Sequence, residues 1–192
     1  MPASSKREQT HERIVDVAAR ALRRQGFAGV GVADVMKQAG LTHGGFYAHF
    51  ESRDALLLEA VERAAAQSAA ATAERIAART AQGMSALQAV IDSYLSDEHL
   101  MATEEGCIVG ALGSEMPRQD EILLQASRAK VQRLIEHVAR ALPEGAPAGQ
   151  AVALAGALVG TLQVARTMGR DDRGRELLGQ ARESLIAQYA VT

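Results

Sequence analysis

Apolar positions between residues 32 and 50 predict two short helices joined by a tight turn. Residues 32–39 carry a stripe at the 3.6-residue spacing of a helix face, formed by Val32, Val35, Met36 and Ala39. Gly40 follows, and a glycine there readily adopts the left-handed conformation that ends a helix. Thr42 is the expected N-cap of a second helix over His43–His49. Two helices joined in this way form a helix-turn-helix, whose second helix enters the DNA major groove.

The second of these helices contains residue types that helix formation alone does not favour. Gly44 and Gly45 each cost roughly 1 kcal/mol relative to Ala, but they let the backbone approach a base edge or a phosphate. Tyr47 and His49 carry donors suited to phosphate oxygens. His43 and His49 could instead be surface histidines or metal ligands. Their i,i+6 spacing disfavours a shared metal, so we expect no metal or other cofactor.

The run GFAGVGVADVMKQAGLTHGGFYAHF (26–50), followed by Ser52, Arg53 and Asp54, resembles the N-terminal domain of TetR-type repressors. The matching positions are Gly26-Phe27, Ala39-Gly40-Leu41-Thr42, Gly44, Tyr47 and His49-Phe50. One position departs from the family, because Gly31 stands where a Ser or Thr usually caps the first motif helix. The resemblance implies DNA contacts, including a phosphate contact by Arg53, at Gly31, Val32, Thr42, His43, Gly44, Tyr47, His49 and Arg53.

The remaining periodicity predicts an all-α chain. We expect a loose arm over Pro2–Lys6, with Lys6 and Arg7 either solvated or reaching along the DNA backbone. A helix from about Thr10 to Gly26 and a long helix from Ser52 to about Arg79 follow, and Phe46 and Phe50 should face inward. Later helices are predicted at Ser85–Leu100, Cys107–Glu115, Asp120–Leu142, Ala148–Met168 and Arg173–Tyr189. This gives a three-helix DNA-binding domain (1–51) joined by the long helix to a helical effector-binding and dimerisation domain (52–192).

Composition and charge agree with an intracellular DNA-binding protein. The first fifty residues hold seven Lys and Arg against four Asp and Glu, a balance of +3. The chain total of −2 therefore leaves −5 for the remainder, so the positive end should face DNA. The single cysteine excludes an internal disulfide and suits the cytoplasm. The N-terminus lacks the apolar segment of a secretion signal.

The apolar run over 151–165 predicts a buried or interfacial helix. At fifteen residues it is shorter than the roughly 18 needed to span a membrane, so no membrane association is expected. The resemblance implies a homodimer joined through the last two helices, although this helix could also be core. The expected interface residues are Ala153, Gly156, Ala157, Gly160, Leu178 and Leu185.

The sequence indicates the effector site less clearly than the DNA-binding domain. The second domain holds only Tyr94 and Tyr189 as aromatic residues, which disfavours a large planar ligand. Cys107 follows Gly106 and begins a predicted helix, where the helix N-terminus could raise the thiolate fraction. This segment resembles a branch of TetR-like regulators whose thiol answers electrophiles or oxidants, although a lone cysteine can be simply a buried apolar residue. The candidate effector residues are Tyr94, Leu100, Met101, Cys107, Met116, Gln163 and Arg166.

These features predict a repressor, not an enzyme, that binds a palindromic double-stranded operator as a dimer and is released by a small molecule. Two alternatives are a constitutive DNA-binding protein without an effector and a repressor switched covalently at Cys107. The sequence contains no nucleophile elbow, phosphate-binding loop or His-Glu-x-x-His motif.

Overall fold

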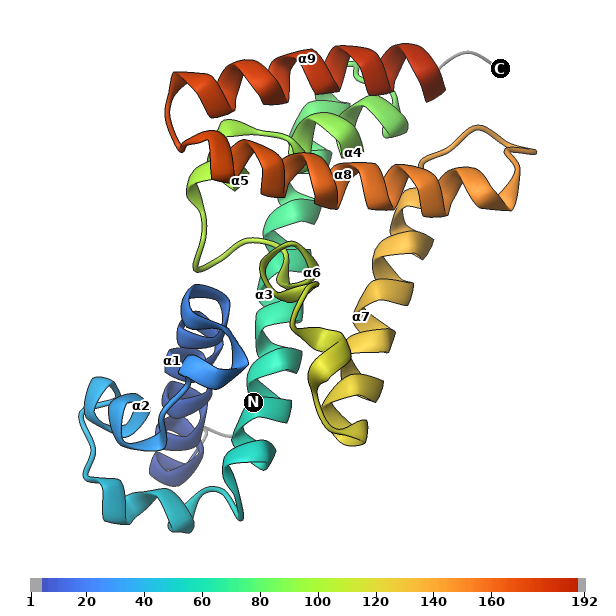
Figure 1. Cartoon of the computed structure of the whole chain (residues 1–192). Coiled ribbons are helices and arrows are strands. Elements are labelled where there is room, and N and C mark those ends of the chain that lie inside the picture. The colour runs from blue at the N-terminus through green and yellow to red at the C-terminus, as the bar shows by residue number, and fades with distance from the viewer. Residues whose placement is uncertain (1–4, 190–192) are drawn as a thin grey trace.

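The computed structural model describes residues 5–189, and within that range the chain is helical and contains no strand (Figure 1). The predicted all-α class is confirmed. The elements in chain order are α1 (Lys6–Gly29), α2 (Val32–Gln38), the 3₁₀ helix η1 (His43–Ala48), α3 (Arg53–Ala81), α4 (Ala86–Tyr94), α5 (Asp97–Met101), α6 (Ile108–Leu112), the 3₁₀ helix η2 (Met116–Arg118), α7 (Glu121–Ala139), α8 (Ala148–Met168) and α9 (Asp172–Tyr189).

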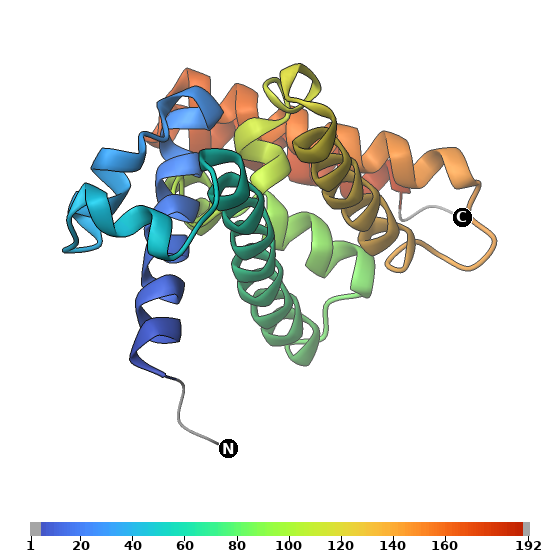
Figure 2. The ribbon, with the colours of Figure 1, turned by 90° about the horizontal axis from the view of Figure 1, so that it is seen from below.

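Helix α3 connects the two ends of the molecule. Helices α1 and α2 and the element η1 gather near its N-terminal half, whereas α8 and α9 lie across its other end (Figure 1). Seen from below, α1 and α3 run side by side (Figure 2), and this pair shares the most extensive helix packing in the fold. At about 1.5 Å per residue, α3 spans roughly 40 Å.

The start of α1 corrects the expected N-terminal arm. Ser5 caps the helix by accepting a hydrogen bond from Glu8 N, while the Glu8 carboxylate accepts from Ser5 N, which is a capping box. Lys6 and Arg7 therefore lie in the first helical turn, and Arg7 donates to the Ala48 carbonyl oxygen at 2.8 Å. The rest of the expected arm, Pro2–Ser4, lies outside the described residues.

The first hydrophobic core joins the helix-turn-helix to α3. The inward position predicted for Phe46 and Phe50 is confirmed, since both rings are buried and stack with centroids 5.4 Å apart. Leu56 and Leu57 are fully buried in the same core. The first half of α3 thus packs with the N-terminal helices, and the proposed domain boundary at residue 51 stays a prediction.

The second core lies between α4, α7, α8 and α9. The bounds predicted for α8 are confirmed. The single helix predicted over Ser85–Leu100 is wrong, because α4 ends at Tyr94 and α5 begins at Asp97. Ser96 causes the break: its hydroxyl accepts from His99 N at 3.1 Å and so caps a new helix.

Candidate functional site

The turn of the helix-turn-helix forms as the residue pattern predicts. Gly31 is the N-cap of α2 and, as a glycine, provides no side-chain capping bond. Gly40 adopts φ +72°, the left-handed conformation that suits glycine. Gly40 N then donates to Lys37 O, and Leu41 N donates to Met36 O, which together are the paired hydrogen bonds of a Schellman motif. This motif fixes the direction in which the chain leaves α2.

The second helix predicted over His43–His49 forms, but as the 3₁₀ helix η1 (His43–Ala48) rather than as an α-helix. Gly44 and Gly45 explain the difference, since two consecutive glycines weaken an α-helix and the segment is only six residues long. Thr42 is the N-cap, as predicted, but its side chain makes no capping hydrogen bond within the described range. Thr42 is exposed at the surface.

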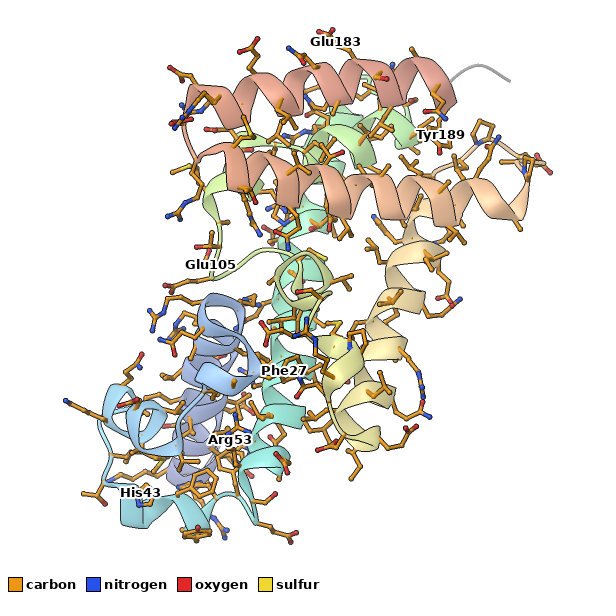
Figure 3. All side chains as sticks on the ribbon, in the orientation of Figure 1. Phe27, His43, Arg53, Glu105, Glu183 and Tyr189 are labelled. Atoms are coloured by element: carbon orange, nitrogen blue, oxygen red, sulfur yellow. The ribbon has the colours of Figure 1, made fainter. Side chains whose placement is uncertain are left out.

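The two sides of η1 differ sharply. Phe46 faces the core, whereas Tyr47 is 72% exposed. Thr42, His43 and Gly44 are also exposed. Figure 3 places His43 at the outer edge of this end of the molecule. One side of η1 is therefore anchored in the core by Phe46, and the other side presents an exposed polar surface.

His49 lies at the end of η1 and is half-buried. Its Nδ1 atom is shielded from solvent and has no hydrogen-bond partner among residues 5–189. Burial lowers the pKa of His49, and the nearby His11 and Arg7 lower it further. The imidazole is therefore biased toward its neutral form, which can still donate one N–H.

Arg53 is the first residue of α3 and lies further from the outer edge of this end of the molecule than His43 (Figure 3). Its Nε donates to the Val30 carbonyl oxygen at 3.0 Å, and its NH2 group donates to the Phe27 carbonyl oxygen. These bonds cap the end of α1 and tie it to α3. The structure thus gives Arg53 an internal role, and its expected phosphate contact stays a prediction.

A cavity of about 450 Å³ opens in the second half of the molecule. It lies between α3 and α7, and α4, α6 and α8 contribute to its walls. Ala65, Ala69 and Ala73 repeat at i,i+4 along the α3 wall and leave the space open. Its volume falls within the roughly 300–1,000 Å³ of small-molecule sites.

Of the seven candidate effector residues, only Tyr94 and Cys107 line this cavity. Leu100 and Met116 are core residues, and Met101 is exposed at the surface. The side chains of Gln163 and Arg166 are held by main-chain carbonyl oxygens. Sequence reasoning missed the polar wall residues on and next to α3 and α7, which are Glu62, Ser68, Thr72, Lys130, Arg133, Glu136, His137 and Arg140.

The end of the cavity wall formed by α4 and α6 contains a chain of polar contacts. His99 is buried, accepts from Cys107 N at Nε2 (3.0 Å), and donates from Nδ1 to the Tyr94 carbonyl oxygen (2.7 Å). Burial lowers the pKa of His99 to about 4, so the ring is neutral at pH 7. Arg166 donates to the carbonyl oxygens of His99 and Ala102. The fold thus brings residues that are distant in sequence close to Cys107. One of them is the cation Arg166, which lies almost sixty positions later in the chain.

Lys130 is the buried cation of the cavity wall. Its side chain is only 2% exposed, and its Nζ forms an ion pair with Glu62, which is half exposed. Because Glu62 lies on α3 and Lys130 on α7, the pair joins the two main walls.

Helix α6 connects the cavity to the DNA-binding end. Its N-terminal residues Ile108 and Val109 line the cavity, and Glu115 follows shortly after its last turn. Glu115 Oε2 accepts from Phe27 N at 2.9 Å, beside Gly26, whose φ is +74°. A Cβ on Gly26 would lie 2.3 Å from Glu115 Oε1, so glycine is what admits the carboxylate.

Helix α8 leaves one apolar side uncovered. Val152, Val164 and Met168 are each about half exposed. Gly156 and Gly160 face open space among the described residues. The predicted interface residues Leu178 and Leu185 are instead buried in the subunit core, because α9 turns them toward α4 and α8.

Helix α8 is long and apolar enough to cross a membrane, with a mean hydropathy of 1.4 over an 18-residue window. The fifteen-residue apolar run over 151–165 did not suggest this. A third of this window is buried in the subunit.

The described part of the chain contains no group of three or more His, Cys, Asp or Glu side chains placed to hold a metal ion.

The N-terminal domain is similar in sequence to known regulatory proteins. Residues 14–60 match the sequence model of the family described as bacterial regulatory proteins, tetR family. A 51-residue segment is 39% identical to the uncharacterized HTH-type transcriptional regulator YerO of Bacillus subtilis (strain 168). That segment covers 27% of this chain and 18% of YerO.

The similarity of fold extends over the whole chain. A TetR transcriptional regulator from Chloroflexus aurantiacus J-10-FL superposes with a TM-score of 0.76 at 24% identity, covering 97% of both chains. The reduced form of E. coli NemR gives a TM-score of 0.72 at 20% identity, covering 92% of this chain and 95% of NemR. The chain therefore has the fold of TetR-type regulators.

Arg53 supplies the first prediction. Arg53→Ala should lower the free energy of unfolding by roughly 1–3 kcal/mol, because the Phe27 and Val30 carbonyl oxygens lose a charged donor. Urea unfolding measures this change, and the exposed Arg128→Ala serves as the control. Unchanged stability would contradict the capping role. A parallel DNA titration over a range of salt concentrations tests the phosphate role, since loss of one contact should reduce the salt slope by about one.

Proposed function

We propose that this chain, whose N-terminal domain is of the TetR type, is a transcriptional repressor that binds DNA as a homodimer and releases it when a small molecule enters the cavity. The observation that supports this proposal is the path through α6. The helix whose first residues line the cavity is followed by Glu115, which bonds the backbone beside Gly26 in the DNA-binding domain. We expect the protein to act in the cytoplasm.

The proposed DNA-reading surface is the exposed side of η1. Thr42, His43 and Gly44 would meet base edges or phosphates, and Tyr47 and His49 would donate to phosphate oxygens. Gly31 and Val32 at the start of α2 complete the expected set. Support comes from the exposure of Tyr47 on a helix whose opposite side is anchored in the core by Phe46.

A ligand could alter DNA binding by moving α6 relative to α1. Ligand contact with Ile108 or Val109 would shift a helix only five residues long, and Glu115 lies three residues beyond its end. Because Glu115 is bonded to Phe27, this shift would reach the helix-turn-helix without passing through a flexible linker. The DNA-reading surfaces of the two subunits would then change their spacing.

The proposed dimer interface is the uncovered side of α8, together with α9. Ala153, Gly156, Ala157 and Gly160 would allow close approach of two copies, with Val152 and Val164 adding apolar area. Two-fold symmetry presents two identical reading surfaces, so the operator should be palindromic. The alternative is a constitutive DNA-binding protein. Such a protein has no effector, so this alternative does not explain why the chain forms a cavity of ligand size.

A second candidate mechanism is covalent switching at Cys107. The thiol lines the cavity and interacts electrostatically with the Arg166 guanidinium. Burial lowers the pKa of Arg166, while Tyr94 and Cys107 act in the opposite direction. A thiolate would add to an electron-poor carbon of a quinone, forming a C–S bond while the displaced electron pair moves to the carbonyl oxygen, which then takes a proton.

Tyr47 and His43 test the DNA-reading surface. Tyr47→Phe should weaken binding to all duplexes by roughly tenfold, since it removes a hydrogen bond to a charged phosphate. His43→Ala should instead change the preferred sequence. Duplexes selected from a random pool, followed by anisotropy titration, measure both effects. The buried Tyr189→Phe at the opposite end is the control. Parent-like affinity of Tyr47→Phe would remove Tyr47 from the interface.

Gly160→Leu tests the dimer interface. Within the subunit a side chain at Gly160 meets open space, so folding should be unaffected. In the dimer it would overpack the contact by roughly 1–3 kcal/mol, weakening association about five- to 150-fold. Sedimentation should show monomers where the parent is dimeric, with unchanged helix content by circular dichroism. Ala129→Leu on the exposed side of α7 is the control, and a fully dimeric Gly160→Leu would move the interface elsewhere.

Cys107→Ser tests the covalent alternative. A quinone, an aldehyde or hypochlorite should release DNA from the parent protein and leave the Cys107→Ser protein bound. Intact-mass spectrometry of the quinone-treated parent should show one adduct per chain, because Cys107 is the only cysteine. Equal release from both proteins would remove Cys107 from the mechanism.

A further inference from the structure

Tyr94 places an unsatisfied hydroxyl in the wall of the cavity. The side chain is only 5% exposed, and its Oη atom has no hydrogen-bond partner in the described range 5–189. A buried hydroxyl without a partner costs roughly 1–3 kcal/mol, so such a group indicates a partner that arrives from elsewhere. Among the described residues that line this cavity, Tyr94 is the only Phe, Tyr or Trp.

The His99 ring cannot accept a hydrogen bond from the Tyr94 hydroxyl, and the neighbouring Cys107 thiol is only a weak acceptor. Both ring nitrogens of His99 are occupied, by Cys107 N and by the Tyr94 carbonyl oxygen, while the two rings pack edge to face with centroids 4.8 Å apart. Burial, and then the neighbouring Cys107 thiol, raise the pKa of Tyr94 well above its ordinary value. The phenol therefore remains protonated and can donate a hydrogen bond to an acceptor atom of a ligand.

Helix α6 makes room for this hydroxyl. A Cβ on Gly110 would lie 3.3 Å from Tyr94 Oη, so the absent side chain admits the phenol beside the helix backbone. Oη is shielded from solvent, which means that a ligand atom reaches it only when neighbouring side chains give way. Those neighbours include Cys107, which directly precedes α6.

The rest of the wall determines the body of the ligand. Aliphatic side chains dominate it, with alanines along α3, Val90 on α4, Val109 on α6, Leu134 on α7 and Leu158 on α8. This part of the wall favours an aliphatic chain over a planar aromatic system, while polar side chains of α3 and α7, among them Ser68, Thr72 and His137, border the same cavity.

We propose that the effector is a small aliphatic molecule whose oxygen acceptor, a carbonyl or a carboxylate, receives a hydrogen bond from Tyr94 Oη. This inference rests on the proposed function in taking the cavity as the effector site. Formation of this bond displaces groups beside α6, which is the helix that leads to Glu115. Ligand recognition and release of DNA then share one contact.

Three probes of equal chain length test the acceptor. 2-Octanone carries a neutral carbonyl, octanoate carries a carboxylate, and 1-chlorooctane carries no oxygen. Calorimetric titration should show that the parent binds one or both oxygen-bearing probes more tightly than 1-chlorooctane. Tyr94→Phe should weaken the tighter-binding oxygen probe by roughly three- to tenfold, the effect of one hydrogen bond, and leave 1-chlorooctane unchanged. Tyr189→Phe, which removes a hydroxyl outside the cavity, should bind all three probes as the parent does.

The infrared carbonyl stretch of bound 2-octanone supplies a readout that altered packing cannot imitate. A hydrogen bond from Tyr94 should lower its frequency in the parent and not in Tyr94→Phe. If octanoate alone binds, the carboxylate stretches of octanoate are compared in the same way. Equal weakening of every probe, an unchanged stretch in both proteins, or no binding of any oxygen-bearing probe would overturn the proposal.

DNA titration separates this proposal from the proposed function. Duplexes selected on the parent are titrated with and without the bound oxygen probe. A Tyr94-dependent probe that leaves DNA affinity unchanged supports the ligand class and contradicts gating. Strong DNA binding by a protein that binds none of the oxygen probes contradicts the ligand class and leaves the DNA-binding function standing.

Discussion

The packing of α1 against the first half of α3 holds the DNA-binding end together. Leu56 and Leu57 of α3 are fully buried in this core, and each such side chain contributes roughly 1.5–3 kcal/mol. The recognition element η1 depends on it, because a six-residue 3₁₀ helix with two glycines has little stability of its own. Phe46 and Phe50 provide the stability that the backbone of η1 lacks, because their buried rings anchor this segment in the same core. A reading surface can thus be short and rich in glycine because its support is large and apolar.

The same packing makes α3 a shared component of both ends, and polar contacts reinforce the junction. Arg23 of α1 is buried and donates to the Ala64 carbonyl oxygen (2.9 Å), to Gln67 (2.9 Å) and to the Glu104 carbonyl oxygen. One cation therefore joins α1, the middle of α3 and the segment before α6. Removal of this cation would leave several buried acceptors unpaired, so the junction acts as a unit.

The features that could be predicted from the sequence are those determined by neighbouring residues. The stripe on α2, the left-handed Gly40 and the start of the long helix at Ser52 depend on contacts within a few positions, and all formed as expected. The ends of α8 follow from Pro147 and Gly169 in the same way. Local signals also identified which side of η1 faces inward.

The remaining features depend on residues far apart in the chain. The cavity exists because α3 and α7 approach each other, and no local pattern reveals that Lys130 would be buried there. Arg53 is engaged by carbonyl oxygens more than twenty positions away. Leu178 and Leu185 belong to an apolar stripe that suits either a core or an interface, and only the rotation of α9 distinguishes the two.

His99 has a consequence for how the subunit responds to acid. Its pKa is lowered to about 4 by burial, below the roughly 6.5 of an unfolded chain, so between these values the unfolded state binds more protons. The stability that His99 supports is therefore complete above about pH 6.5, declines as pH falls, and is lost below about pH 4. At neutral pH the ring is in its neutral form, and its Nε2 atom remains available to accept from Cys107 N. The wall beside Tyr94 thus keeps one fixed pattern of donors and acceptors across the physiological pH range.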